Sequence, residues 1–464
     1  MHGPALNDDI DILGIGMPLK LYTQICLCFP LADASSHPTI INTLTNGLER
    51  LSASFPWLSG QVVNEGSGIF KIRPLERIPR LVVQDLRHDP SIPTMDALRR
   101  ANFPFSMLDE SIVAPCKTLS GSSDDSASDS APIFLVQANF ITGGLLLTVV
   151  GQHQSMDMIG QGQIIHLLSK ACCNEEFTNE ELSAGNMARR NLIPLLDDSY
   201  KPGPELARQI GKPPNGHPAP PPKCSWTYFI FDHTSLIALK SLATQTMILP
   251  SGYISTDDAL SAFIWQSVIR ARLHRLDPTA ESTFGRAVDV RRYLGIPPKY
   301  PGVVTNMTYH TYTLQKLVEE PLGSIASQFR SAVDPKTSNL AYNTRALATV
   351  QNRPPDQSIV SVTATIDPST DIMVSSWAKV DCYQLGFNFG LGKPEAIRRP
   401  QFDPVESLIY LMPRTPDGEI AVAICLRDED MERLRADEEF AKFAKATISS
   451  SSHAVPATTP PMKP

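Results

Sequence analysis

The sequence predicts a mixed α/β protein that divides into two domains. Two apolar, β-branched runs at residues 133–141 and 145–150 flank Gly143 and Gly144, a pattern typical of a β-hairpin. Apolar residues at helical spacing follow residue 157, so strands and helices share the same region. A chain of 464 residues is also long enough to bury a large core and to form two domains.

A proline-rich stretch lies near the middle of the chain. Residues 211–223 hold a dense set of prolines, which cannot form a core and indicate a stiff linker. We therefore expect one domain at residues 1–210 and another at residues 224–446. The Ser- and Asp-rich residues 117–132 predict a mobile loop, and residues 447–464 predict a disordered tail.

The composition narrows the class of protein. Hydrophobic residues make up 42% of the chain and charged residues 19%, and no run of 18 apolar residues suggests a membrane span. The N-terminus lacks the basic and apolar regions of a signal peptide, so we expect a cytoplasmic location. The eight cysteines form no Cys-x-x-Cys pair, which predicts reduced thiols and no metal site. A net charge of −7 without a basic tract argues against a nucleic-acid partner.

His153 and Asp157 are the residues that point most directly to chemistry. His153 follows the second apolar run, and Asp157 precedes the helical pattern. A neutral imidazole can accept a proton from a hydroxyl group that attacks a carbonyl. Asp157 need not touch the imidazole, because a buried acid is stabilised by a buried arginine and can hold the loop in shape. Such a short pattern arises often by chance, so the rest of the chain decides its meaning.

Two further patterns lie in the second half. Ser255 and Asp258 form a capping-box pattern before the apolar stripe at residues 260–268, which predicts a capped amphipathic helix. Asp289 and Arg291 alternate with valines, which predicts that both lie on one face of a strand as an ion pair.

Several short motifs follow one another in a fixed order between about residues 20 and 445. They are FPWLSG at residues 55–60, HQSMDM at 153–158, RNLIPLLD at 190–197, STDDALSAFIW at 255–265, VDVR at 288–291, TN at 305–306, SSW at 375–377 and NFGLGKP at 388–394. Each is weak alone. Together they resemble the BAHD-type acyl-CoA-dependent acyltransferases, and within them the fungal branch of trichothecene 3-O-acetyltransferase-like enzymes.

The resemblance implies a fold and a reaction. The fold would consist of two similar chloramphenicol-acetyltransferase-like domains, each a mixed β-sheet flanked by helices, with an active-site channel between them. The reaction would transfer an acyl group from acyl-CoA, most simply acetyl-CoA, to a hydroxyl of a polycyclic secondary metabolite in a ternary complex. His153 would be the general base, and Asp157 would pair with Arg291 as a structural residue. We expect a monomer whose partners are the CoA thioester and a small hydroxylated acceptor.

The resemblance also assigns residues around the two substrates. Ser255 and Thr256 would lie beside CoA, where the free N–H groups at the start of a helix suit an anion. Lys299 could contact a CoA phosphate, although a solvated surface charge is the simpler interpretation. Ser375 and Trp377 would line the acceptor side of the channel, and a tryptophan there is as readily a core residue.

The NFGLGKP motif departs from the family pattern. Asn388, Gly390 and Gly392 would form a structural motif in which Asn388 replaces the usual aspartate and Leu391 the usual tryptophan. Asparagine keeps the size and hydrogen-bonding ability of aspartate but loses its charge.

Two other classes of protein remain open on the sequence alone. Condensation-type domains, which join acyl groups carried on proteins, typically have a second histidine before the catalytic one and a glycine after the acid, whereas this chain has Gln152 and Met158. A binding or scaffold protein that has lost the chemistry is supported only by Asn388 and Leu391. Intact His153 and Asp157 argue against it.

Overall fold

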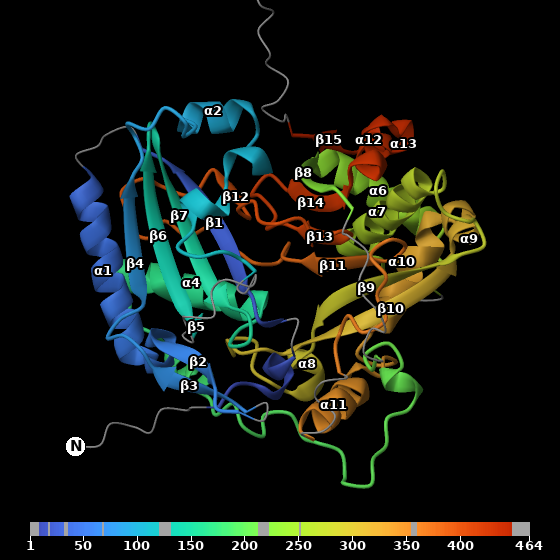
Figure 1. The fold of residues 1–464 in the computed structure, drawn as a ribbon, viewed down its shortest axis with the longest axis horizontal. Helices are drawn as coiled ribbons and strands as arrows, with labels where there is room; N and C mark the ends of the chain where they lie inside the picture. The colour runs from blue at the N-terminus through green and yellow to red at the C-terminus, as the bar shows by residue number, and fades with distance from the viewer. Residues whose placement is uncertain are drawn as a thin grey trace, which may run out of the picture.

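The computed structural model describes residues 9–16, 19–31, 36–66, 69–119, 131–211, 222–249, 252–353 and 360–447. Two large sheets lie side by side, each accompanied by helices, which confirms the predicted mixed α/β class (Figure 1). Most of the predicted linker at 211–223, of the loop at 117–132 and of the tail at 447–464 falls outside the described residues. Those three expectations therefore stay predictions.

The first sheet has the strand order β12-β1-β7-β6-β4. Its strands are β1 (Tyr22–Pro30), β4 (Arg80–Asp85), β6 (Phe134–Ile141), β7 (Gly144–Gln152) and β12 (Ala396–Arg398). The predicted hairpin is confirmed, because β6 and β7 pair antiparallel up to Ile141 and Gly144. Gly143 in the turn has a φ of 79°, a conformation that glycine adopts without steric cost. Strand β4 runs parallel to β6, so the sheet is mixed.

The second sheet has the order β10-β9-β11-β13-β14-β8-β15. Its strands are β8 (Cys224–Phe231), β9 (Glu281–Asp289), β10 (Thr305–Thr313), β11 (Ile372–Ser376), β13 (Leu408–Leu411), β14 (Ile420–Arg427) and β15 (Lys445–Ala446). Strand β11 runs parallel to both of its neighbours. A small third sheet, in the order β3-β2-β5, consists of β2 (Gly60–Asn64), β3 (Phe70–Pro74) and β5 (Ala131–Pro132).

Helices connect and cover these sheets. The α-helices are α1 (His37–Ser54), α2 (Met95–Arg100), α3 (Glu110–Val113), α4 (Met158–Cys172), α5 (Asn179–Gly185), α6 (His233–Gln245), α7 (Thr256–Arg272), α8 (Arg291–Leu294), α9 (Leu314–Glu319), α10 (Leu322–Ala332), α11 (Leu340–Gln351), α12 (Asp428–Ala436) and α13 (Glu438–Ala441). The short 3-10 helices are η1 (Ile12–Ile15), η4 (Pro56–Ser59), η5 (Phe105–Met107) and η6 (Pro204–Leu206).

The core of the first sheet extends into the second half of the chain. Apolar residues of β1, β7, α1 and α4 form one cluster with residues from one face of β8 and β14. The other face of the second sheet packs against α6, α7 and α10, which Figure 1 shows at the right of the molecule. The site at the end of β7 therefore lies where the two halves meet.

Two features refine the sequence-based picture. Strand β12 belongs to the second half of the chain but pairs with β1 of the first sheet. The division into domains at 1–210 and 224–446 stays a prediction, and it would assign this strand to the second domain. The prediction that Arg291 lies in a strand is wrong, because β9 ends at Asp289 and Arg291 is the first residue of α8. A period of two over four residues was too short to locate the strand end.

Candidate active site

His153 lies directly after the last residue of β7 and before the start of α4. Its backbone N–H donates a hydrogen bond to the carbonyl of Leu21 over 2.9 Å, which continues the pairing with β1. Its ring atom Nδ1 lies 3.1 Å from the carbonyl oxygen of Met156. A carbonyl oxygen only accepts hydrogen bonds, so the neutral ring carries its proton on Nδ1. Nε2 is then left with a free lone pair, which is what a general base requires.

The surroundings of His153 favour this neutral form. The residue keeps partial solvent exposure, although protein surrounds it closely. Burial lowers the pKa of its imidazole, whereas the Met156 carbonyl and the Asp157 carboxylate raise it, and the net pKa lies below the ordinary value of 6.5. The imidazole is therefore unprotonated at neutral pH and can accept a proton.

Asp157 caps the helix that follows the histidine. Its Oδ1 accepts hydrogen bonds from the N–H of Gly160 over 2.8 Å and from Arg291 Nη2 over 3.0 Å. Its Oδ2 accepts from the N–H of Val304 over 2.9 Å and from Thr305 Oγ1 over 3.1 Å. Burial by itself would raise the pKa of Asp157, but these contacts outweigh it, so the pKa is lowered and the carboxylate stays charged.

Arg291 meets Asp157 from the second half of the chain. Its side chain is 1% exposed and donates further hydrogen bonds to Asp289, over 2.8 Å, and to the carbonyls of Tyr300 and Gly302. Burial alone would lower the pKa of the guanidinium, but the carboxylates of Asp157 and Asp289 raise it. All three guanidinium nitrogens thus donate hydrogen bonds, and these bonds hold the loop after β9 against the loop after β7.

Sequence reasoning missed a second buried ion pair beside the first. Arg189 Nη1 lies 2.6 Å from Asp11 Oδ2 and 2.8 Å from the carbonyl oxygen of Ser155. Asp11 also accepts hydrogen bonds from the Tyr300 hydroxyl and, over 2.9 Å, from the N–H of Val303. The pair therefore joins the loop that carries His153 to the loop after α8, which holds Tyr300 and Val303. Asp11 and Arg189 are 178 residues apart, and no local pattern in the sequence marks either.

Close packing at the start of α4 explains why residue 160 is a glycine. A Cβ atom on Gly160 would lie 1.9 Å from the carbonyl oxygen of Pro301. Only glycine lets the first turn of α4 approach this backbone so closely. The approach brings Asp157, three residues earlier, within reach of Val304 and Thr305.

The predicted helix cap at Ser255 is confirmed. The N–H of Asp258 donates to Ser255 Oγ over 3.1 Å, and Asp258 accepts the Ser255 N–H over 2.9 Å, so the capping box is complete. Asp258 also forms ion pairs with Arg286 Nη1, at 2.9 Å, and with Arg330 Nε, at 2.8 Å. Thr256 is the first residue of α7. The start of this helix therefore carries two arginine side chains as well as its own acids.

The start of α7 also touches the segment that was predicted to line the acceptor. Ser376 Oγ donates a hydrogen bond to Asp257 Oδ2 over 2.5 Å, and Asp257 pairs with Arg286 at 2.7 Å. Ser375 and Trp377 flank Ser376, and Trp377 Nε1 donates to Ser375 Oγ over 3.0 Å. The structure thus brings the residues predicted for CoA, Ser255 and Thr256, next to those predicted for the acceptor.

Trp377 and Lys299 have other contacts of their own. Trp377 is 2% exposed, and its ring lies 4.8 Å from that of Tyr410, so it is a core residue whatever else it contacts. Lys299 Nζ forms an ion pair with Glu180 at the start of α5, at 2.8 Å. The lysine therefore has an acidic partner in this structure, as the surface-charge interpretation expects.

The NFGLGKP segment lies against the first sheet. Asn388 has a φ of 56°, and Gly390 and Gly392 have φ values of 75° and 77°. Asparagine tolerates the left-handed conformation better than most residues, which explains why it can stand at this position. The ring of Phe389 packs edge-on against Phe29 of β1, 5.8 Å between centroids. The segment thereby attaches the chain of the second half to the core of the first.

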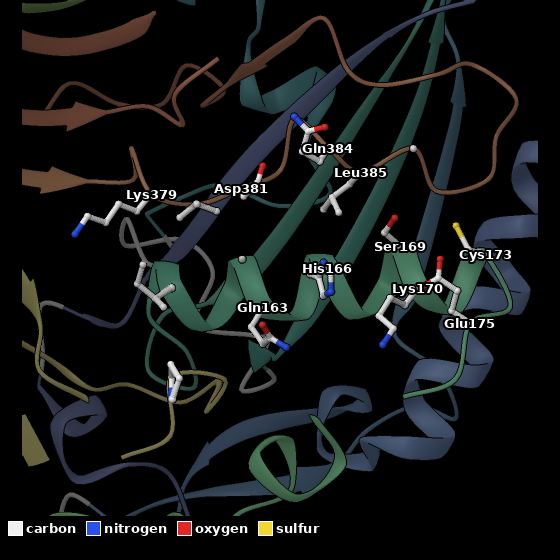
Figure 2. Close-up of a pocket in the computed structure, with 15 residues that line it drawn as sticks. Gln163, His166, Ser169, Lys170, Cys173, Glu175, Lys379, Asp381, Gln384 and Leu385 are labelled. Atoms are coloured by element: carbon white, nitrogen blue, oxygen red, sulfur yellow. The ribbon is translucent and has the colours of Figure 1, made fainter. Parts of the chain in front are cut away.

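A groove of about 530 Å³ runs along the outer side of α4 (Figure 2). Gln163, His166 and Lys170 line it from the helix, and Lys379 and Gln384 line it from the segment that leads to Asn388. None of the predicted site residues lines this groove.

Comparison with known proteins identifies the family of this chain. Residues 21–172 match the trichothecene 3-O-acetyltransferase-like N-terminal domain, and residues 117–441 match the Transferase family. The chain is a member of the BAHD transferase family. This BAHD transferase is an acyltransferase, and the resemblance predicted from its motifs is confirmed.

Three relatives show how closely the family is matched. This BAHD transferase is 59% identical to O-acetyltransferase dmxR13 of Cryptosporiopsis sp. over 94% of its own length and 97% of that protein. It is 53% identical to trichothecene 3-O-acetyltransferase TRI101 of Fusarium sporotrichioides, over 95% of its own length and 97% of that protein. The crystal structure of F. graminearum TRI101 with coenzyme A and deoxynivalenol matches with a TM-score of 0.90 and 47% identity. The match covers 95% of this chain and 99% of the chain in that structure.

Among the helices that the structure describes, none combines the length and apolar character that crossing a membrane requires.

Proposed function

We propose that this BAHD transferase is an acyl-CoA-dependent O-acetyltransferase that acts on a hydroxyl group of a polycyclic secondary metabolite. The observation that carries the proposal is the state of His153. Its Nδ1 faces the Met156 carbonyl, its pKa is lowered by burial, and it keeps partial exposure at the junction of the two halves. This combination suits a general base that takes a proton from a hydroxyl group.

His153 would act on the acceptor directly. Nε2 accepts the hydroxyl proton while the acceptor oxygen attacks the thioester carbonyl of acetyl-CoA. The tetrahedral intermediate then collapses, the carbon–sulfur bond breaks, and the departing CoA sulfur takes the proton from the imidazolium. The products are the acetyl ester and free CoA, so no group on the enzyme is acylated.

Asp157 and Arg291 would position His153 and take no part in proton transfer. The Asp157 carboxylate is occupied by four donors, and the imidazole Nδ1 bonds to Met156 instead. The pair fixes the turn between His153 and α4, which keeps Nε2 in one place. The Asn388, Gly390 and Gly392 segment would act further away, by securing the contact between the halves.

The substrates are inferred from contacts and from relatives. Relatives of known structure were crystallised with coenzyme A, and one with deoxynivalenol. In this chain the family resemblance supports a CoA site at the start of α7, with Ser255 and Thr256, and the helix N–H groups there would suit an anion, whereas Arg286 and Arg330 are neutralised by Asp257 and Asp258. Ser375 and Trp377 would border the acceptor. Lys299 would need to leave Glu180 to contact a phosphate, so it is the weakest of these assignments.

The two alternatives have less support. Gln152, which stands where condensation-type domains have histidine, accepts the N–H of Ser155 over 3.1 Å and braces the turn. A scaffold role would not require the lowered pKa of His153 or its free Nε2. We also propose a cytoplasmic location, because all eight cysteines are free thiols, which suits a reducing compartment.

The test is release of free CoA from acetyl-CoA with purified protein and a panel of polycyclic alcohols that includes deoxynivalenol. Acceptor-dependent release, with the acetyl ester identified by mass spectrometry, would support the proposal. Hydrolysis of acetyl-CoA at a rate independent of acceptor, or transfer only from a carrier protein, would contradict it.

A further inference from the structure

Arg399 is a buried cation that has no carboxylate partner among the residues that the structure describes. It follows the last residue of β12 and is 1% exposed. Its Nε and Nη1 have no hydrogen-bond partner among the described residues, and its Nη2 reaches only Thr118 Oγ1, at 3.5 Å. A fully buried guanidinium normally has an acid or several carbonyls around it, as Arg291 has. Arg399 therefore requires an explanation that the fold alone does not give.

Aromatic rings surround the guanidinium. Its central carbon lies 4.3 Å from the ring centre of Phe402, 4.7 Å from that of Tyr410 and 5.4 Å from that of Trp377. Such contacts offset part of the cost of burying a cation, but they satisfy none of its N–H groups. Trp226, whose ring lies 5.0 Å from that of Phe402, has an unpartnered Nε1 as well. The cluster thus holds surplus hydrogen-bond donors.

Glu110 lies within electrostatic reach of Arg399 but forms no ion pair with it among the described residues. Glu110 accepts hydrogen bonds on Oε2 from the Thr118 N–H, over 2.7 Å, and from Gln24 Nε2, over 3.0 Å. Burial raises the pKa of Glu110 and the Arg399 cation opposes this rise, but no ion pair joins the two side chains among the residues that the structure describes. Arg399 Nε and Nη1 thus keep N–H groups that no described residue accepts.

The cluster lies beside the catalytic strand. Thr118, which Arg399 approaches, accepts the backbone N–H of Tyr22 over 2.9 Å. Tyr22 pairs with Gln152, the residue before His153. The charge of Arg399 also lies close enough to His153 to disfavour its protonation. Arg399 therefore lies within electrostatic reach of His153, and its guanidinium faces the ring of Trp377, the residue predicted to border the acceptor.

We propose that Arg399 is an acceptor-binding residue that donates hydrogen bonds to a ketone, carboxylate or phenolate oxygen of the acceptor, at a distance from the hydroxyl that is acetylated. The inference rests on the proposed function and specifies its substrate class. The unpartnered Nε–H and Nη1–H groups face different edges of the guanidinium, so each can donate a hydrogen bond to a ligand oxygen of its own. The surrounding rings would pack against the carbon skeleton of a polycyclic molecule.

A ligand role and a structural role make opposite predictions for stability. If Arg399 exists for the ligand, Arg399→Met removes an unsatisfied buried charge and leaves the melting temperature unchanged or higher. If Arg399 exists for the fold, the same substitution lowers the melting temperature. Thermal unfolding without substrates measures this difference and does not depend on whether acetyl transfer occurs.

Ligand selectivity is the second and decisive readout. We would use pairs of polycyclic alcohols that differ only by a ketone, and measure the binding of each by quenching of tryptophan fluorescence in the presence of CoA. The wild type should bind the ketone-bearing member about 10- to 100-fold more tightly, as expected for a hydrogen bond to a charged donor. Arg399→Met should reduce this ratio to about 1. Because the ratio compares two ligands on one protein, it does not depend on how much of a variant is folded.

Arg398→Met is the matched control. Arg398 is a buried neighbour that also has an unpartnered Nε, but its guanidinium stacks on Phe103 and Tyr228. This variant should keep the wild-type ratio. A wild type without a preference in any pair, or an Arg399→Met variant that retains the preference, would overturn the inference. A protein that binds the ketone-bearing alcohols selectively but transfers no acetyl group would support Arg399 as the anchor while contradicting the proposed function.

Discussion

Arg291 Nη2 lies 3.0 Å from Asp157 Oδ1, and both side chains are almost completely buried although 134 residues separate them in the sequence. The contact joins the loop after β7 to the start of α8. It makes the position of His153 depend on residues from both halves of the chain, since Asp157 also caps α4.

Asp157→Asn should destabilise the protein strongly. The substitution leaves Arg291 buried with one carboxylate fewer, and breaking a buried pair in this way costs about 3–5 kcal/mol. Asp289→Asn is the control, because Asp289 contacts the same guanidinium but its side chain is 40% exposed, and we expect a loss below about 1 kcal/mol. Urea unfolding measures both free energies. Equal losses in the free energy of unfolding would show that burial does not determine how much the Asp157–Arg291 pair stabilises the fold.

Arg189→Met should impair turnover more than acetyl-CoA binding. Arg189 donates to the carbonyl of Ser155, inside the turn that follows His153, so its loss should let this turn move. We expect kcat to fall about tenfold, as for a misplaced catalytic group, with little change in the KM for acetyl-CoA. Arg190→Met changes the exposed neighbour and should behave like the wild type. A rise in KM at constant kcat would instead indicate a role in binding.

The pH dependence of acetyl transfer should show a base with a low pKa. Burial is the main cause of the lowered pKa of His153, so the active, neutral form persists below pH 6.5. A plot of kcat/KM against pH should therefore be flat through neutral pH and decline only at acidic pH, with its midpoint below 6.5. A midpoint above 7 would mean that the imidazole is not in the environment described.

His310 should make the folded protein sensitive to acid. Burial, and after it the Arg286 cation, lowers the pKa of His310 to about 4. Between about pH 6.5 and 4 the unfolded chain binds a proton at this residue and the folded chain does not, so the free energy of unfolding falls as the pH falls through this window. His310→Met should lose less stability than the wild type between pH 7 and pH 5 in urea unfolding. Identical losses would mean that His310 titrates normally in the folded state.

Local patterns predicted those parts of the site that local chemistry determines. The hairpin before His153, the helix after Asp157 and the capping box at Ser255 each depend on neighbours within a few residues. Alternation of valines with charged residues over four positions predicts a strand that includes Arg291. The structure shows that β9 ends at Asp289. The motif resemblance, and no local pattern, implied its pairing with Asp157.

The features that sequence reasoning missed all depend on distant partners. Asp11 and Arg189 meet because both reach the loops between the two halves, and neither lies in a motif. Arg399 is unusual because its Nε and Nη1 have no hydrogen-bond partner among the described residues, and a sequence does not show which side chains will lack partners. Such contacts follow from the packing of whole sheets.

The most direct test of the central claim is the rate of acetyl transfer by His153→Ala, measured with a separate measurement of its affinity for CoA. If His153 is the general base, the rate should fall by about 10²- to 10⁴-fold while the protein binds CoA as the wild type does. A variant that binds CoA normally and retains more than about a tenth of the wild-type rate would show that another group accepts the proton, and would contradict the account.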